Sequence, residues 1–286
     1  MSDSELRYLS RCPVGCSSEL EMTQYALPEG ALLRCKSCGQ LISQCTVTDY
    51  WESMREFDDP KGTLPVAGSE QRRFRRSKGF LDRISKLLDK SPGQIQLLDV
   101  GCSSGAFLNT AVKLGFLAEG VEPAPKAAAA AQASGLNVRQ GLLQECEYAD
   151  GQFDAVTLFE VIEHLQQPQE LLQEVHRILR PNGILLIGTG NAASWSMAAM
   201  GGRWEYLSIA KHGGHISFFS PASIAALAQR SGFSVMAVRT RRVRFYEKGD
   251  CSMPLYHITK LIGELLNVFA VLFDKGHDMT VYLRKV

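Results

Sequence analysis

Two carboxylates and a histidine stand close together in the sequence, at Glu160, Glu163 and His164. On one turn of a helix these positions share a face, because side chains three and four residues apart are neighbours there. Oxygen and imidazole ligands in this arrangement suit a hard divalent cation, with His212 or His215 as a further ligand. Without a metal, His164 and His215 are candidate catalytic bases, and a structural role in a loop is the alternative for each. Either chemistry would help to remove a proton from a hydroxyl group.

Four cysteines form two pairs near the start of the chain. Three residues separate Cys12 from Cys16, two separate Cys35 from Cys38, and 18 residues lie between the pairs. This spacing is typical of a zinc ribbon, whose four thiolates leave no open position on the metal. Cys45 is an alternative ligand, and unrelated buried cysteines are the alternative interpretation. The pattern therefore predicts a structural zinc ion that stabilises a segment too small to fold alone.

A glycine turn follows an apolar run that contains an acidic residue. The strand-like segment 95–100 includes Asp99, and Gly101 and Gly105 precede a predicted helix. Backbone N–H groups at a helix start bind polar or anionic ligands, and glycine allows close approach. Glu122 follows Asp99 by 23 residues, where a carboxylate can accept hydrogen bonds from ribose hydroxyls. We expect a nucleoside ligand. An unliganded turn is one alternative, and a dinucleotide site is another, although the third glycine of that motif is missing.

Strand-like and helical patterns alternate through the rest of the chain. Strands are predicted at 95–100, 116–121, 136–138, 153–159, 184–189, 233–244 and 279–283. Helices are predicted at 106–114, 125–133 and 169–179, and another begins after Ser220-Pro221. Such alternation is typical of a parallel sheet with crossover helices. We therefore expect a zinc-ribbon-like module at 1–50, a linker and covering helix at 51–90, and an α/β domain at 91–286.

Composition excludes several classes of protein. The chain has 286 residues, of which 45% are hydrophobic, so it can bury a full core and is neither fibrous nor disordered. A formal net charge of +1 predicts no general attraction to nucleic acid. We expect a cytoplasmic protein with reduced thiols, because no secretion signal pattern is seen. The apolar stretch 255–273 contains His257, Lys260 and Glu264 and is not expected to span a membrane.

Three segments resemble the class I S-adenosylmethionine-dependent methyltransferases. They read LLDVGCSSGAFL, GVEP and FDAVTLFEVIEHLQQPQELLQEVHRILRPNGILLIGTGN, within roughly residues 90–240. The resemblance implies an α/β fold with a Rossmann-like seven-stranded sheet and helices on both faces. It also implies that the glycine loop holds the methionine end of S-adenosylmethionine and that Glu122 holds the ribose. The implied cofactor-binding residues are Asp99, Gly101, Cys102, Ser103, Gly105, Glu122, Pro123, Phe159 and Glu160.

Finer details of the resemblance concern the acceptor and the metals. The 160–164 pattern resembles that of ubiquinone-biosynthesis O-methyltransferases and the metal site of small-RNA 3′-end 2′-O-methyltransferases, which implies Mg²⁺ or a similar cation. The cysteine module resembles zinc ribbons fused before methyltransferase domains of natural-product and sugar-modifying enzymes. The chain also departs from the family pattern, since Asn182 replaces a common glycine and Gly190 replaces a proline. Residues 141–144 lack the acidic residue that often binds the adenine amino group.

The expected reaction is O-methylation of a small metabolite, sugar or quinone-like precursor, with the segment 195–219 over the acceptor. An RNA-modifying methyltransferase and a non-catalytic S-adenosylmethionine-binding protein are the alternatives. Basic clusters at 72–78 and 239–244 would favour RNA, but a solvated helix face and a charged edge strand are the preferred interpretation. The apolar face of 255–273 is expected to pack on the core or on a second subunit. Contact with a membrane surface is the alternative.

Overall fold

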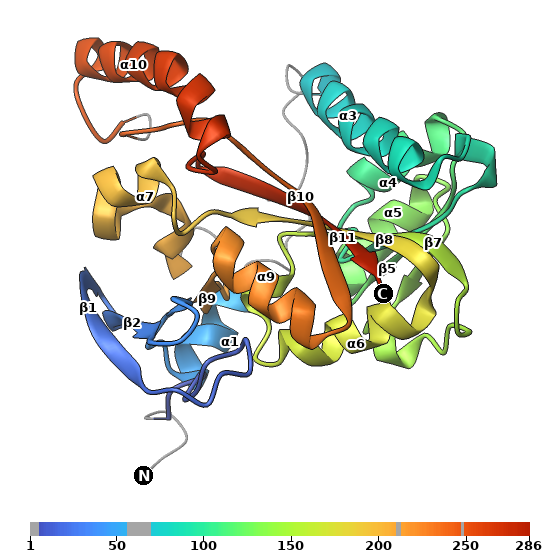
Figure 1. Cartoon of the computed structure of the whole chain (residues 1–286), viewed down its shortest axis with the longest axis horizontal. Coiled ribbons are helices and arrows are strands. Elements are labelled where there is room, and N and C mark those ends of the chain that lie inside the picture. Colours follow the sequence, from blue (N-terminus) through green and yellow to red (C-terminus); the bar gives the residue numbers. More distant parts are fainter. Residues whose placement is uncertain (1–5, 56–69, 210–212, 247–248) are drawn as a thin grey trace.

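The computed structural model describes residues 6–55, 70–209, 213–246 and 249–286. A large central sheet has helices on both faces, and a small sheet lies beside it (Figure 1). The strands of the large sheet are β4 (Gln96–Val100), β5 (Leu117–Glu122), β6 (Val138–Gln140), β7 (Phe153–Phe159), β8 (Leu179–Gly190), β10 (Phe233–Arg241) and β11 (Asp278–Lys285). Their order is β10-β11-β8-β7-β4-β5-β6. The prediction of a seven-stranded Rossmann-like sheet is confirmed.

Only β11 runs against its neighbours in this sheet. It pairs antiparallel with β8 and β10, while the other neighbouring strands pair in parallel. β8 begins before the predicted strand and includes Asn182, whose φ is +64°. Asparagine tolerates this left-handed conformation better than most residues, which explains why it can replace the common glycine. β10 ends before the predicted residue 244, because Arg242 leaves the extended conformation with a φ of +62°.

Helices cover both faces of the large sheet. They are α3 (Glu70–Leu88), α4 (Ala106–Lys113), α5 (Pro125–Ala133), α6 (Pro168–Ile178) and α9 (Pro221–Arg230). Leu81 of α3 belongs to the same buried cluster as Leu97 and Leu186, whereas Leu172 of α6 lies with Leu98 on the other face. Neighbouring strand residues thus point to opposite apolar layers, as expected for a parallel sheet that is buried on both sides.

The small sheet joins the N-terminal module to the α/β part of the chain. Its strands are β1 (Leu20–Leu27), β2 (Gly30–Cys35), β3 (Leu41–Ile42) and β9 (Ser217–Phe218). All pairs are antiparallel, and β9 is the only one of the four that comes from the α/β part of the described chain. The Ser43 N–H also donates to the Ile216 carbonyl at 2.9 Å. Backbone hydrogen bonds therefore attach the N-terminal module to the segment that carries His215.

Helix α1 (Val47–Arg55) adds side-chain contacts to this attachment. The Tyr50 hydroxyl donates to the His164 carbonyl at 3.2 Å, and the Ser53 hydroxyl accepts from the Gly214 N–H at 2.8 Å. The linker predicted after this helix lies largely in residues 56–69, outside the described residues. The domain boundaries at residues 50 and 90 stay predictions.

The glycine-rich aromatic segment before β9 is packed between the two sheets. It contains α7 (Trp195–Met200) and two short helical turns at Gly201–Arg203 and Glu205–Leu207. Trp204 is 1% exposed and shares a buried cluster with Leu32 of β2 and Phe218 of β9. The predicted cover of the acceptor is thus a packed layer in this structure. His212, the alternative metal ligand, lies outside the described residues.

Helix α10 (Met253–Leu272) projects from the β10 edge of the sheet (Figure 1). By length and composition it is the one helix among the described residues that could cross a membrane. The apolar positions expected to pack on the core are instead mostly exposed, and Leu265 and Leu272 are 67% and 71% exposed. Packing of this face on the core is contradicted, because the helix contacts the protein through its small residues Gly263 and Ala270, and packing on a second subunit stays a prediction.

Candidate functional site

The glycine loop between β4 and α4 folds tightly around the end of β5. Gly101, Ser103 and Gly105 all have positive φ values, of 70°, 50° and 81°. A Cβ atom on Gly105 would overlap the Leu136 side chain, so this position requires glycine for both conformation and space. The loop therefore presents backbone rather than side chains at the carboxyl ends of β4 and β5, which is a suitable cradle for a polar ligand.

Glu122 organises the turns on both sides of this cradle. Its carboxylate accepts hydrogen bonds from the Ser103 N–H at 2.7 Å and from the Ala124 N–H at 2.8 Å. The residue is 7% exposed, and burial raises its pKa against the opposing effect of these hydrogen bonds. Two of the carboxylate lone pairs are used inside the protein, and a carboxylate can accept further hydrogen bonds. Pro123 follows it on the surface.

Asp99 and Cys102 are both buried. The Asp99 carboxylate accepts a hydrogen bond from the Thr157 hydroxyl at 2.6 Å, and burial raises its pKa to about 7. The Cys102 side chain is 6% exposed and packs in a cluster with Leu108 and Ala131. These two buried side chains therefore support the glycine loop from inside the protein. Cys102 can offer a ligand its backbone rather than its thiol.

Phe159 lies at the end of β7, beside helices α3 and α4. Its ring lies 4.8 Å from the Phe107 ring of α4 and 5.3 Å from the Phe80 ring of α3, measured between centroids. A Cβ atom on Gly188 would fall 2.5 Å from the Phe159 ring, so the next strand leaves room for this side chain. Phe159 ends β7 as an aromatic wall, and the chain turns at Glu160, where φ is +53°.

The structure brings Glu160, Glu163 and His215 together at this turn. One ligand atom from each residue lies within 4.8 Å of the others, and the His215 Nε2 atom is 4.0 Å from the Glu163 Oε1 atom. Glu163 and His215 are buried, and the Thr189 hydroxyl donates to Glu163 Oε1 at 2.8 Å. Desolvation and the neighbouring Glu163 raise the pKa of Glu160 well above its usual range. This group has the oxygen and nitrogen donors for a cation or a shared proton.

The group of Glu160, Glu163 and His215 does not include His164, which the sequence predicts as a ligand beside the two glutamates. The three residues Ile162–His164 form a single 3-10 turn after the left-handed Glu160, so His164 is not on the face that an α-helix would give it. Its ring instead packs edge-on against the His215 ring, with centroids 4.7 Å apart. Burial lowers the pKa of His164, which favours the neutral imidazole.

Tyr206 fixes the orientation of His215. The His215 Nδ1 atom lies 3.1 Å from the Tyr206 carbonyl oxygen, and the two rings are stacked at 5.8 Å. Because a carbonyl oxygen can only accept, Nδ1 carries the proton, and in the neutral ring the Nε2 lone pair then faces Glu163. A Cβ atom on Gly190 would fall 2.8 Å from the Tyr206 ring. Gly190, which replaces the usual proline, therefore leaves room for the Tyr206 ring.

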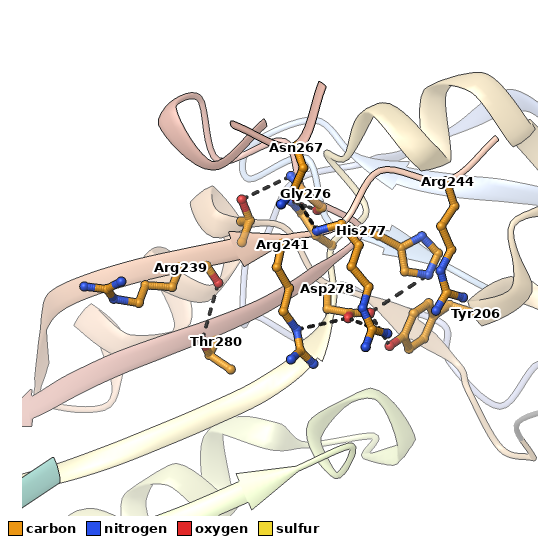
Figure 2. A network of polar contacts seen from close by, with 12 residues as sticks. Tyr206, Arg239, Arg241, Arg244, Asn267, Gly276, His277, Asp278 and Thr280 are labelled. Atoms are coloured by element: carbon orange, nitrogen blue, oxygen red, sulfur yellow. Dashed lines mark hydrogen bonds and ion pairs between the residues drawn. The ribbon is translucent and has the colours of Figure 1, made fainter. Parts of the chain in front are cut away.

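A polar network behind Tyr206 was not predicted from the sequence. The Tyr206 hydroxyl donates to Asp278 at 3.2 Å, and Arg241 forms an ion pair with Asp278 at 3.2 Å (Figure 2). His277 Nε2 lies 3.0 Å from Glu205, which also accepts from Arg244 at 2.8 Å. Burial, together with the neighbouring Arg76, lowers the pKa of Arg241 to about 10. The Tyr206–Asp278 and Glu205–His277 pairs are each 72 residues apart and the Arg244–Glu205 pair is 39 residues apart, so no local pattern signals them.

The four predicted zinc ligands meet in the N-terminal module. The sulfur atoms of Cys12, Cys16, Cys35 and Cys38 all lie within 4.8 Å of one another, and those of Cys12 and Cys38 are 3.6 Å apart. A tetrahedral zinc site with Zn–S bonds of about 2.3 Å needs sulfur separations of about 3.8 Å, so the donor set fits. Cys45 is buried but lies outside this group.

Glycine turns shape both halves of the cysteine group. Gly15 and Gly39 have φ values of 82° and 71°, and their N–H groups donate to the Cys12 and Cys35 carbonyls at 3.1 and 2.9 Å. Burial opposes ionisation of Cys35, but a hydrogen bond with the Ser18 hydroxyl and nearby backbone N–H groups lower its pKa to about 6. The two matching turns therefore orient the thiols toward one centre.

Comparison with known proteins agrees with this geometry. A family model described as a methyltransferase domain matches residues 70–238. The ubiquinone biosynthesis O-methyltransferase of Azorhizobium caulinodans is 30% identical over 151 residues, which are 49% of this chain and 59% of that protein. The protein of the same name from Thiobacillus denitrificans is 30% identical over 148 residues, covering 48% of this chain and 63% of the relative. The match spans about three fifths of these relatives.

Solved structures agree with the fold. A SAM-dependent methyltransferase from Archaeoglobus fulgidus is 18% identical with a TM-score of 0.51, covering 73% of this chain and 94% of that chain. An S-adenosylmethionine-dependent methyltransferase from Mesorhizobium loti, also 18% identical, has a TM-score of 0.51 and covers 71% and 96%. The family model matches more than half of the chain, including the glycine loop, Glu122 and the 160–164 turn. This chain therefore belongs to the methyltransferase-domain family.

Proposed function

We propose that this protein transfers a methyl group from S-adenosylmethionine to a hydroxyl group of a small, quinone-like or related acceptor. The observation that carries the proposal is the group of Glu160, Glu163 and His215, whose ligand atoms lie within 4.8 Å of one another beside the glycine loop. Groups that bind or remove a proton are needed next to the methyl donor for O-methylation. The names of the two relatives above support an O-linked, quinone-like product.

The residues of the β4–α4 loop and Glu122 would hold the cofactor. Bound S-adenosylmethionine would supply an electrophilic methyl group, so the protein has mainly to align the acceptor and exclude competing water. Backbone N–H groups of the loop would bind the methionine end, and the fixed Glu122 carboxylate would accept from the ribose. Phe159, packed between Phe80 and Phe107, would separate this end from the acceptor.

On the acceptor side, His215 is the proposed base, and it lies beside the two glutamates. Its Nδ1 proton is held by the Tyr206 carbonyl, which leaves Nε2 to take a proton from a hydroxyl. Glu163, buried and 4.0 Å from Nε2, would stabilise the imidazolium that results. His164 would support this geometry through its ring contact with His215 rather than react itself.

A divalent cation is the alternative to the base role of His215, because Nε2 can either bind a cation or take a proton. Glu160 and Glu163 are two carboxylates that share a site, and His215 adds a nitrogen ligand, so the donor chemistry fits Mg²⁺ or a similar ion. A cation held there would lower the pKa of a bound hydroxyl. We also propose that Cys12, Cys16, Cys35 and Cys38 hold a structural zinc ion, which would leave no open coordination position.

The test uses purified protein, methyl-labelled S-adenosylmethionine and a panel of catechols, hydroquinones and sugars, with products detected by mass spectrometry. Glu163→Gln is expected to lower turnover by roughly 10²- to 10⁴-fold, with the affinity for S-adenosylmethionine nearly unchanged. The control is Glu19→Gln, an exposed glutamate of the cysteine module. If the cation is required, chelator should abolish turnover and Mg²⁺ restore it, while zinc content measured in the same samples separates the two metals.

Three outcomes would overturn parts of the proposal. Label that enters RNA but no small molecule would favour the RNA-modifying alternative. Full turnover in metal-depleted protein that keeps its zinc would remove the divalent cation. Absence of S-adenosylmethionine binding by calorimetry would remove the activity altogether.

A further inference from the structure

Helix α10 contacts the protein through small and polar residues. A Cβ atom on Gly263 would overlap the Val243 carbonyl, so the helix lies directly against the chain that follows β10. The Thr240 hydroxyl donates to the Ala270 carbonyl at 3.1 Å, and the Arg242 N–H donates to Asn267 at 2.6 Å. This face holds the helix along the edge of the protein. A helix of a folded domain normally turns its large apolar residues inward, and here the opposite face is packed.

The large apolar residues of α10 are exposed on one continuous side. Positions three and four apart on a helix are neighbours, so these residues form a stripe along its whole length. They are Leu255, Ile258, Leu261, Ile262, Leu265, Val268, Phe269 and Leu272, each at least 40% exposed. A contiguous apolar surface of this extent is rare on a monomer and marks a contact with another apolar phase. Lys260 and Glu264 border the stripe as an exposed ion pair.

Several positively charged side chains lie where α10 meets the end of β10. A cavity of about 720 Å³ lies there, lined by Arg72, Arg242, Arg244 and Lys260 and, among the described residues, by one carboxylate, Glu264. Its aromatic lining includes Tyr246 and Tyr256, which are suited to a polar–apolar boundary.

Neighbouring carboxylates offset only part of this charge. Arg244 is paired with Glu205, whereas Arg242 shares Asp278 with Arg241. The described charges around the cavity thus keep an excess of positive charge beside the apolar stripe.

This combination of charge and apolarity decides between two occupants of the exposed face. A second copy of the chain would bring a second cationic cavity toward the first, and repulsion between like charges would oppose that contact. An anionic lipid surface complements both parts, because its acyl region accepts the apolar stripe and its phosphates accept the cations. The packed Gly263 face keeps the helix against the protein, so the helix would lie in the surface rather than cross it.

We propose that α10 and the adjacent cationic cavity dock the protein onto an anionic lipid bilayer. A series of contacts connects the cavity with the candidate site. Arg242 lines the cavity and lies 3.7 Å from Asp278, which accepts from Tyr206, and the Tyr206 ring stacks on His215. These contacts would connect the docked face with the candidate acceptor site, and an apolar acceptor is concentrated in the lipid.

The experiment is flotation of the full-length protein with vesicles, without S-adenosylmethionine or acceptor. Vesicles of phosphatidylcholine with phosphatidylglycerol are compared with vesicles of phosphatidylcholine alone. The wild-type protein should bind the anionic vesicles at least about tenfold more tightly. Leu261→Asp with Leu265→Asp should abolish binding, because it places two charges in the apolar stripe. The variant should still fold, since both side chains are more than half exposed and contribute little to folding. Arg72→Glu with Lys260→Glu should weaken binding to anionic vesicles alone by about tenfold or more.

The matched control is Met22→Asp, which places the same charge on a 77% exposed apolar residue of β1 and should leave binding unchanged. Absence of flotation with anionic vesicles at low salt would overturn the proposal. Equal binding to both vesicles would overturn the role of the cations. A dimer by light scattering that Leu265→Asp converts to monomer, with vesicle binding intact, would assign the stripe to a second copy instead. Because the assay needs no turnover, its failure is distinct from failure of the proposed methyl transfer.

Discussion

The donor and acceptor sides of the candidate site are built in different ways. Asp99, the glycine loop and Glu122 come from one β-α-β unit, and two neighbouring parallel strands bring them together. Glu163, His215, Tyr206 and Asp278 come from segments between residues 160 and 278, and the N-terminal module supports one of them through β3 and β9. The donor side therefore depends on local structure, whereas the acceptor side depends on long-range contacts that can be disturbed separately.

The largest effect should come from removing the cysteine group. Cys35→Ser with Cys38→Ser should release zinc and loosen the β3–β9 pairing that holds the His215 segment, because metal binding and folding are coupled in such modules. We expect turnover to fall by about 100-fold or more with little change in S-adenosylmethionine affinity. Zinc analysis, product formation and calorimetry would measure this. Cys251→Ser, at a partly exposed position outside the group, is the control. If the affinity for S-adenosylmethionine fell in parallel with turnover, the donor and acceptor sides would not be independent.

Glu122→Ala should disturb the donor side alone. It removes the acceptor for the Ser103 and Ala124 N–H groups as well as the proposed ribose contact. We expect S-adenosylmethionine affinity to fall by about 100-fold, equivalent to about 2.7 kcal/mol. Isothermal calorimetry checks this, with Glu119→Ala on the same strand as the control. Unchanged affinity would refute the placement of the ribose.

Asp99 should make the stability of the donor side depend on pH. Its pKa is raised from 3.8 to about 7 in the folded protein, so the folded state keeps a proton that the unfolded chain loses. The unfolding free energy should therefore decline as pH rises from about 4 to about 7, by up to about 4 kcal/mol from this residue. Asp99→Asn removes this titration, so its stability relative to wild type should increase over that range. Urea unfolding at several pH values tests this, and a difference independent of pH would contradict it.

Gly190→Ala should have the smallest effect and act on the acceptor side. The new Cβ would displace the Tyr206 ring from its place beside His215, at a cost of about 1–3 kcal/mol in stability and several-fold in turnover. Gly79→Ala is the control, since nothing lies within 4 Å of its Cβ in helix α3, and it should stabilise slightly. Thermal unfolding and product formation give the comparison. Wild-type values for Gly190→Ala would mean that the position of Tyr206 is unimportant.

The sequence alone determined the strands of the large sheet, the glycine loop and the four-cysteine group, whereas the strands of the small sheet were not predicted. Each depends on residues that are close in the chain, such as the apolar runs of β4 and β7 or the glycines that follow them, so local spacing is enough to predict them. Asp99, Gly101, Gly105 and Glu122 meet as expected because parallel strands end at the same edge of a sheet.

Tertiary structure alone decided the acceptor side and the surface of the molecule. His215 rather than His164 joins the glutamates because Glu160 is left-handed and a 3-10 turn follows it, which helical spacing cannot reveal. The contacts of Tyr206 with Asp278 and of β3 with β9 join residues far apart in the chain. The apolar stripe of α10 is visible in the sequence. Whether the stripe faces the core or the solvent depends on which face of the helix packs against the protein. Packing through Gly263 left that stripe exposed.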